Sequence, residues 1–162
     1  MLHLIPAPLH RALYRLAHAA RLYWWRVRRP KITGCSAVVC DAAGSVLLVR
    51  HSYGRGGWAL PGGGVRRGED PAETVMRELA EETGVRLERV TAFGVLDEAL
   101  SGARNRVHLF AAVTRDTPRA DGRELVEVRF FPLARLPAEI GRKSRARIEV
   151  WLKAAEAVRP PG

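Results

Sequence analysis

Apolar residues recur at helical spacing near the beginning of the chain. The positions three or four residues apart are Leu9, Leu13, Leu16 and Ala20. Pro8 suits a first helical turn, and Pro30 should end the helix because proline cannot continue the hydrogen-bond ladder. The pattern predicts an amphipathic helix over residues 8–29, with arginines on another face.

The pattern changes to strand-like apolar runs after Pro30. Two runs flank Asp41-Ala-Ala-Gly44, which predicts a β-hairpin, and the glycine-rich stretch 51–64 predicts a loop. The other expected elements are strands at 91–97, 107–114 and 126–132 and a final helix from about Arg142 to Val158. This order predicts an α+β fold in which helices pack on a largely β core. We expect one domain over residues 31–162, preceded by a helical arm over residues 1–30.

The loop at 51–64 leads into a helix with clear start and stop signals. Asp70 is a good N-cap, Pro71 suits the first helical position, and Glu73 completes an acidic version of the capping box. Gly84 is placed to end the helix in a left-handed conformation. These signals predict a helix between Asp70 and Gly84.

Charge is concentrated in the arm. The chain has 162 residues and a net charge of +10, of which +7 falls in residues 1–40, where there is no acidic residue. The total charge therefore describes the arm and not the bulk of the protein. Cys35 and Cys40 fit neither a metal motif nor a disulfide framework, so we expect ordinary core or strand residues and a reducing cytoplasm. No run of 18 apolar residues predicts a membrane-spanning helix.

The helix between Asp70 and Gly84 carries three carboxylates on one face. Glu78, Glu81 and Glu82 lie within little more than one turn, and like charges at this spacing destabilise a helix by roughly 0.2–0.5 kcal/mol per pair. A positive group should therefore lie among them. Magnesium prefers carboxylate oxygens and keeps open positions for phosphate, so the pattern favours a divalent-metal site beside a glycine-rich loop. A solvated acidic face is the alternative.

The surrounding residues decide between these interpretations. Gly63, Glu69 and the run Arg77-Glu-Leu-Ala-Glu-Glu-Thr-Gly-Val85 resemble the complete Nudix box, and the preceding Trp58-Ala-Leu-Pro-Gly62 resembles that family's usual approach to it. The resemblance implies an α/β/α sandwich with a mixed sheet. It also implies hydrolysis of a nucleoside diphosphate linked to another group, with Mg²⁺, or alternatively Mn²⁺, as cofactor.

The resemblance assigns roles to matching positions. Glu78, Glu81 and Glu82 would be metal ligands, and Glu78 would double as general base. The carbonyl of Gly62 or Gly63 would be a further ligand. Glu69 and Arg77 would orient the loop and the helix.

Other candidates lie outside the box. Family members often use another acid, for which Glu127 and Glu124 are the first candidates and Asp97 and Glu98 the second. Aromatic and arginine side chains commonly bind bases and phosphates. The substrate-binding candidates on this basis are Tyr53, Arg55 and Arg106.

We therefore predict a metal-dependent pyrophosphohydrolase acting on a small nucleotide, because no position of the box is damaged. The alternative is a Nudix-fold binding or regulatory module that attaches to a membrane surface or nucleic acid through its basic arm. An RNA-end pyrophosphohydrolase is a third interpretation. We expect the arm to serve packing, homodimer formation or attachment to an anionic surface, and not the chemistry.

Overall fold

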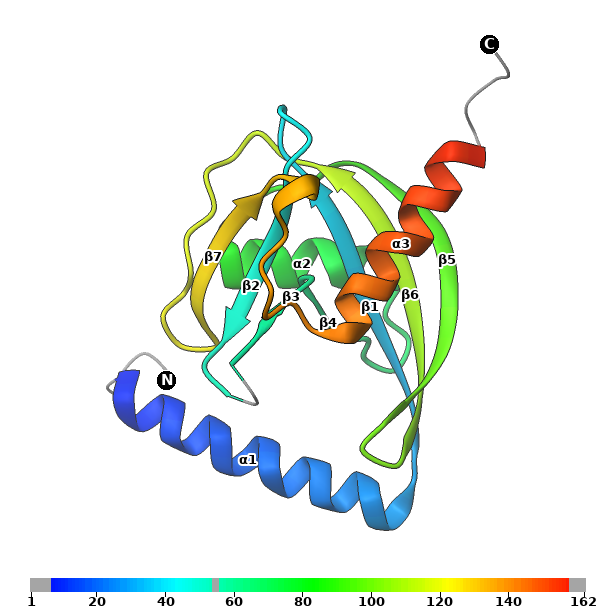
Figure 1. The fold of residues 1–162 in the computed structure, drawn as a ribbon. Helices are drawn as coiled ribbons and strands as arrows, with labels where there is room; N and C mark the ends of the chain where they lie inside the picture. Colours follow the sequence, from blue (N-terminus) through cyan, green and yellow to red (C-terminus); the bar gives the residue numbers. More distant parts are fainter. Residues whose placement is uncertain (1–6, 54–55, 158–162) are drawn as a thin grey trace.

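The computed structural model describes residues 7–53 and 56–157 (Figure 1). The helices are α1 (Ala7–Arg28), α2 (Pro71–Thr83) and α3 (Arg142–Ala157), with a short 3-10 turn at Leu133–Arg135. The strands are β1 (Lys31–Cys40), β2 (Val46–His51), β3 (Trp58–Ala59), β4 (Gly62–Gly64), β5 (Glu88–Leu100), β6 (Ala103–Val113) and β7 (Leu125–Phe131). The predicted order of helices and strands is confirmed, but the stretch 51–64 is not only a loop because β3 and β4 lie within it.

The strands form a mixed sheet in the order β3-β2-β1-β6-β5, with β4 also paired to β1 and β7 to β2. Strands β1 and β6 run parallel, from the pair Lys31 and Arg104 to the pair Cys40 and Val113, and the other pairings are antiparallel. Because β1 pairs with β2 only at Cys40, the rest of that edge is available to β4. The glycine-rich segment is thereby fixed against the centre of the sheet.

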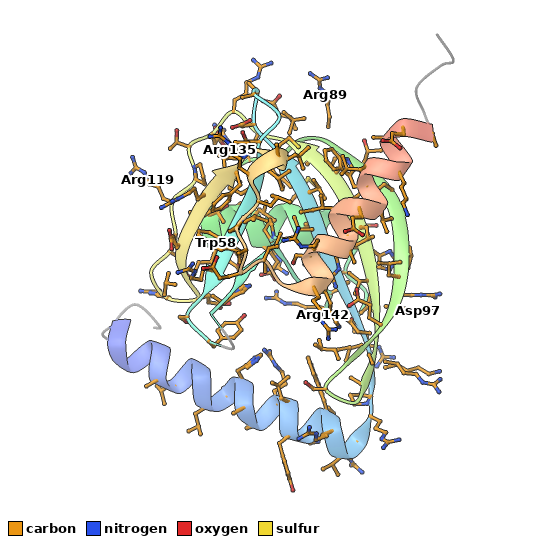
Figure 2. All side chains as sticks on the ribbon, in the orientation of Figure 1. Trp58, Arg89, Asp97, Arg119, Arg135 and Arg142 are labelled. Carbon is orange, nitrogen blue, oxygen red and sulfur yellow. The ribbon has the colours of Figure 1, made fainter. Side chains whose placement is uncertain are left out.

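Helices cover both faces of the sheet, α2 on one side and α3 on the other (Figure 1). On the α2 side, Val75 and Leu79 pack with Ala37 of β1 and Phe110 of β6 in one buried cluster. A second cluster on the α3 side includes Trp58, Val38, Leu48 and Ile148. These two cores confirm the predicted α/β/α sandwich, and Figure 2 shows the Trp58 side chain inside the molecule.

Helix α1 crosses the end of the sheet at which the β5–β6 hairpin and the loop after β2 lie (Figure 1). The predicted apolar stripe does not face the domain, since Leu13 is 48% exposed and Leu16 is 69% exposed. Among the side chains of α1 whose burial is described, His18, Leu22 and Trp25 are half-buried instead. None of the helices in the described ranges is long and apolar enough to cross a membrane.

Candidate functional site

Helix α2 holds the acidic cluster in a fixed position. The Asp70 carboxylate accepts hydrogen bonds from the backbone N–H groups of Ala72 at 2.7 Å and Glu73 at 3.2 Å, and Gly84 ends the helix with a left-handed φ of 70°. Both predicted caps are confirmed. Leu79 is fully buried, and its burial fixes the rotation of α2 about its axis. The glutamates therefore lie along the edge of the buried face of the helix.

The glycines before α2 allow the backbone to approach two neighbours closely. A Cβ at Gly62 would collide with the carbonyl oxygen of Cys35, and a Cβ at Gly63 would lie 2.7 Å from the carboxyl carbon of Glu78. The Gly63 carbonyl accepts a hydrogen bond from the Cys35 thiol at 3.5 Å, and burial raises the pKa of that thiol to about 11. Strand β4 therefore brings backbone oxygens to the side of α2 that carries Glu78.

Arg77 is the positive group that the charge crowding predicted. Its guanidinium contacts Glu69 at 2.9 Å, Glu78 at 2.9 Å and Glu81 at 3.2 Å. Glu69 also accepts a hydrogen bond from the backbone N–H of Arg66, and these contacts, with that of Arg77 first, lower the pKa of Glu69 to about 2. Arg77 thus links the loop to the helix, as the resemblance implied.

Glu82 lies outside this arrangement. Glu82 is only 8% exposed, and it takes part in no ion pair within the described ranges. The pKa of Glu82 is raised to about 8. The largest cause is burial, and the negative charges of other carboxylates, Glu124, Glu78, Asp121 and Glu81, add to it. A buried carboxylate close to other negative charges is destabilised unless a cation neutralises it.

The donor set fits a hard divalent cation, although the site is not preassembled. Carboxylate and carbonyl oxygens are the ligands that Mg²⁺ prefers, and a cation would relieve the repulsion at Glu82. Among the described residues, however, no three His, Cys, Asp or Glu side chains are grouped as a metal site. Arg77 explains this, because it engages Glu78 and Glu81 in the structure. A metal ion held by Glu78 and Glu81 would require these two carboxylates to move away from Arg77.

Tyr53 lies beside the acidic cluster. Burial raises the pKa of its hydroxyl, followed by the negative charges of Glu124 and Glu82. Its ring is 5.0 Å from that of His51 and 4.6 Å from that of His18 on α1. Tyr53 is therefore a substrate-binding candidate that the structure brings to the site.

Glu127 and Glu124, the first candidates for an acid outside the box, have different neighbours. Glu127 contacts Arg50 at 3.4 Å and Arg129 at 3.0 Å. Its neighbour Val128 packs against the α2 core, so Glu127 lies on the opposite side of the sheet, because successive side chains of a strand alternate between the two faces. Glu124, just before β7, is the first of the charges that act on Glu82. The structure therefore favours Glu124 over Glu127 as the additional acid.

The remaining candidates are engaged elsewhere. Glu98 forms ion pairs of 2.9 Å with both Lys143 and Arg147, which tie β5 to α3. Asp97 projects outward from β5 (Figure 2) and contacts Arg106 at 3.3 Å. Arg106 is thus paired on the surface, and no contact of the described residues brings it to the glutamates. The other arginine candidate, at position 55, lies outside the described residues.

Two features of the site carry no signal in the sequence pattern. The negative charge of Asp121, in the connection before β7, helps to raise the pKa of Glu82. Asn105 is buried on β6, and its Oδ1 has no hydrogen-bond partner among the described residues. It lines a cavity of about 930 Å³ together with Gly62, Gly63 and Ser144 of α3.

Comparisons with known proteins agree with this geometry. Residues 30–152 match the family model described as NUDIX domain. The RNA pyrophosphohydrolase of Shewanella sediminis is 43% identical over 53 residues, which is 33% of this chain and 30% of that protein. The RNA pyrophosphohydrolase of Pseudoalteromonas translucida is 47% identical over 53 residues, with the same coverage. The matches thus span less than a third of these relatives.

A solved structure is similar over most of the domain. The crystal structure of the MutT NUDIX hydrolase from Burkholderia pseudomallei has a TM-score of 0.67 and 29% sequence identity. The similarity covers 74% of this chain and 96% of that chain.

Proposed function

The chain belongs to the Nudix family, and we propose that it is a divalent-metal-dependent pyrophosphohydrolase of a nucleoside diphosphate linked to another group. The family model covers residues 30–152, which include the acidic helix and both cores. The proposed substrate is a small nucleotide, and the proposed ion is Mg²⁺ or Mn²⁺.

One observation carries this proposal: Glu82 is buried, its pKa is raised by burial and by the negative charges of four other carboxylates, and no cationic side chain of the described residues is paired to it. A solvated acidic face would not be buried and would gain nothing from such crowding. An unpaired buried carboxylate destabilises the fold unless a cation neutralises it. The crowding is useful where a metal ion binds.

The residues can be assigned roles in hydrolysis. Glu78, Glu81, Glu82 and the carbonyl of Gly62 would hold the metal, which when bound neutralises phosphate charge and acidifies water. Glu78 is half-buried beside the glycine loop and has a pKa raised by burial, so it suits proton acceptance from the attacking water.

Glu124 is the second candidate for the general base because its charge acts on Glu82. Arg77 is a positioning residue, since it contacts the carboxylates and the loop. It can move to a phosphate oxygen when Glu78 and Glu81 bind a cation.

A second candidate substrate is the 5′-triphosphate end of RNA. The names of the two relatives favour it, but the matched segment is only 30% of each of them. The basic arm also favours it, because phosphate-rich ligands are attracted by clustered arginines.

A substrate screen tests the proposal. The purified chain is incubated with nucleoside triphosphates, dinucleoside polyphosphates, nucleotide sugars and 5′-triphosphorylated RNA, each with Mg²⁺ or with a chelator. We expect cleavage of a pyrophosphate bond in at least one class, and loss of cleavage with the chelator. Nucleotide binding without hydrolysis of any class would instead support the regulatory module.

A further inference from the structure

Helix α1 has two different sides. Among the described side chains of this helix, the exposed large apolar ones are Leu13, Leu16, Tyr23, Trp24 and Val27. The half-buried side chains His18, Leu22 and Trp25 recur four and three residues apart, so they share the side that faces the domain. A histidine and a tryptophan thus face the domain together with the aliphatic Leu22.

Helix α1 contacts the domain at its middle and near its C-terminal end. The His18 ring lies 4.6 Å from the ring of Tyr53, which is adjacent to the acidic cluster. Near the C-terminal end of α1, a Cβ at Gly102 of the β5–β6 turn would lie 3.0 Å from the Cα of Arg26. The backbone N–H of Arg104 also donates to the Pro30 carbonyl at 3.0 Å. These contacts hold α1 across the glycine loop.

A cavity of about 810 Å³ lies between α1 and that loop. Arg21 and Trp25 line it from α1, and Gly63, Gly64, Arg66 and Arg67 line it from the loop. Gly63 is the residue whose Cβ would meet the carboxyl group of Glu78. The three glutamates do not line the cavity, which instead extends from glycines next to Glu78 to the helix.

The lining has the chemistry of a phosphate and base site. No ion pair of the described residues involves Arg21, Arg66 or Arg67, whereas Glu69 in the same lining is paired with Arg77. The Arg21 guanidinium lies 5.4 Å from the ring centre of Trp25 and 3.2 Å from His18 Nδ1. Unpaired guanidinium groups bind phosphate, and a half-exposed indole stacks on a base.

We propose that α1 completes the substrate site, with Arg21 binding a phosphate and Trp25 contacting the nucleoside of a 5′-polyphosphorylated nucleotide. This inference rests on the proposed function for the position of the reacting phosphates. It differs from the arm's expected role in packing or attachment alone, and it concerns residues that precede the matched family segment at 30–152. The ligand is either a free nucleotide or the first nucleotide of an RNA.

The test compares residues on the two sides of α1. Arg21→Ala and Trp25→Ala alter the lining, and Arg28→Ala and Trp24→Ala are matched controls with exposed side chains that do not line this cavity. For each protein kcat and KM are measured with Mg²⁺ on a nucleoside triphosphate and on 5′-triphosphorylated RNA, and equilibrium binding of both ligands is measured in parallel. Circular dichroism verifies that α1 remains helical, which alanine favours.

We expect Arg21→Ala to raise KM and weaken binding about tenfold, as for loss of a charge-assisted hydrogen bond, with kcat within about twofold. Trp25→Ala should act in the same direction, and the controls should match the wild type. An effect on both ligands supports binding of the first nucleotide by Arg21 and Trp25, and an effect on RNA alone would overturn that assignment.

Three results overturn one or both proposals in distinguishable ways. Arg21→Ala and Trp25→Ala proteins that hydrolyse and bind like the controls overturn the role of α1 and leave the hydrolase proposal intact. A wild type that binds these two ligands but hydrolyses no class of the substrate screen, with weaker binding in both variants, retains the α1 site and overturns the hydrolase proposal. A wild type that neither binds these two ligands nor hydrolyses any class of the screen overturns both.

Discussion

Replacing Glu82 with glutamine should stabilise the metal-free protein at alkaline pH while it abolishes hydrolysis. Glu82 is 8% exposed, and burial together with the charges of Glu124, Glu78, Asp121 and Glu81 raises its pKa to about 8. In the unfolded chain the same carboxyl titrates near its ordinary value of about 4.3. The folded state therefore binds this proton more tightly than the unfolded state does.

The sign and size of the effect follow from proton linkage. A raised folded-state pKa contributes stability that is fully present below the unfolded pKa and is lost as pH rises through the folded pKa of about 8. Each unit of pKa difference corresponds to 1.36 kcal/mol, so the shift sets an upper limit of about 4–5 kcal/mol. Water entry and side-chain relaxation reduce such penalties, so we expect the Glu82→Gln protein to be about 1–3 kcal/mol more stable than wild type at pH 8.5.

The assay is urea unfolding with a chelator present at pH 5.5 and pH 8.5. The wild type should lose stability between these values, and the Glu82→Gln protein should lose less. Glu81→Gln is the matched control, because the Glu81 side chain is 61% exposed and paired with Arg77. Mg²⁺ should restore wild-type stability at pH 8.5 and leave Glu82→Gln nearly unchanged. Equal pH dependence in wild type and Glu82→Gln would refute the reasoning.

Two further predictions concern the acid outside the box and the core. Glu124→Gln should lower kcat about 100-fold or more if Glu124 is the general base. Glu127→Gln, which breaks contacts with two arginines, should change kcat less than about threefold. Both variants are compared by steady-state kinetics across pH, and a reversal of the two effects would contradict this prediction. Leu79→Ala should lower the free energy of unfolding by about 2–5 kcal/mol, since Leu79 is 1% exposed; a loss below 1 kcal/mol in urea unfolding would show that the α2 interface repacks.

The features that the sequence predicted best depend on local signals. The caps of α2 at Asp70 and Gly84 act on backbone groups within a few residues, so the structure matches them. The hairpin at Asp41 is equally local, since its carboxylate accepts hydrogen bonds from the N–H groups of Ala43 and Ser45. The contact between Arg77 and Glu69 follows from the resemblance, because the box fixes both positions.

The choice between Glu124 and Glu127 depends on the fold and not on local signals. Alternation along β7 separates Glu127 from Val128 and Phe130, which pack on the α2 side. The sequence indicates this alternation but not which side faces α2. The pairing of β7 with β2 decides it, by placing Glu127 opposite Arg50.

The placement of α1 was also beyond the sequence pattern. The stripe containing Leu13 and Leu16 predicted a helix but left open what would cover its apolar side, and both residues are exposed. The observed attachment uses His18 against Tyr53, a contact between residues 35 positions apart that periodicity does not encode. Helix periodicity indicates which residues share a side, and tertiary contacts decide which side faces the domain.

Titration of Mn²⁺ into the wild type and the Glu82→Gln protein, followed by electron paramagnetic resonance, tests the central claim most directly. It detects the bound ion without depending on the identity of the substrate. The claim that the acidic face of α2 is a metal site predicts saturable binding to the wild type and affinity at least tenfold weaker in the Glu82→Gln protein. Equal affinity in the two proteins, or no saturable binding to the wild type, would contradict it.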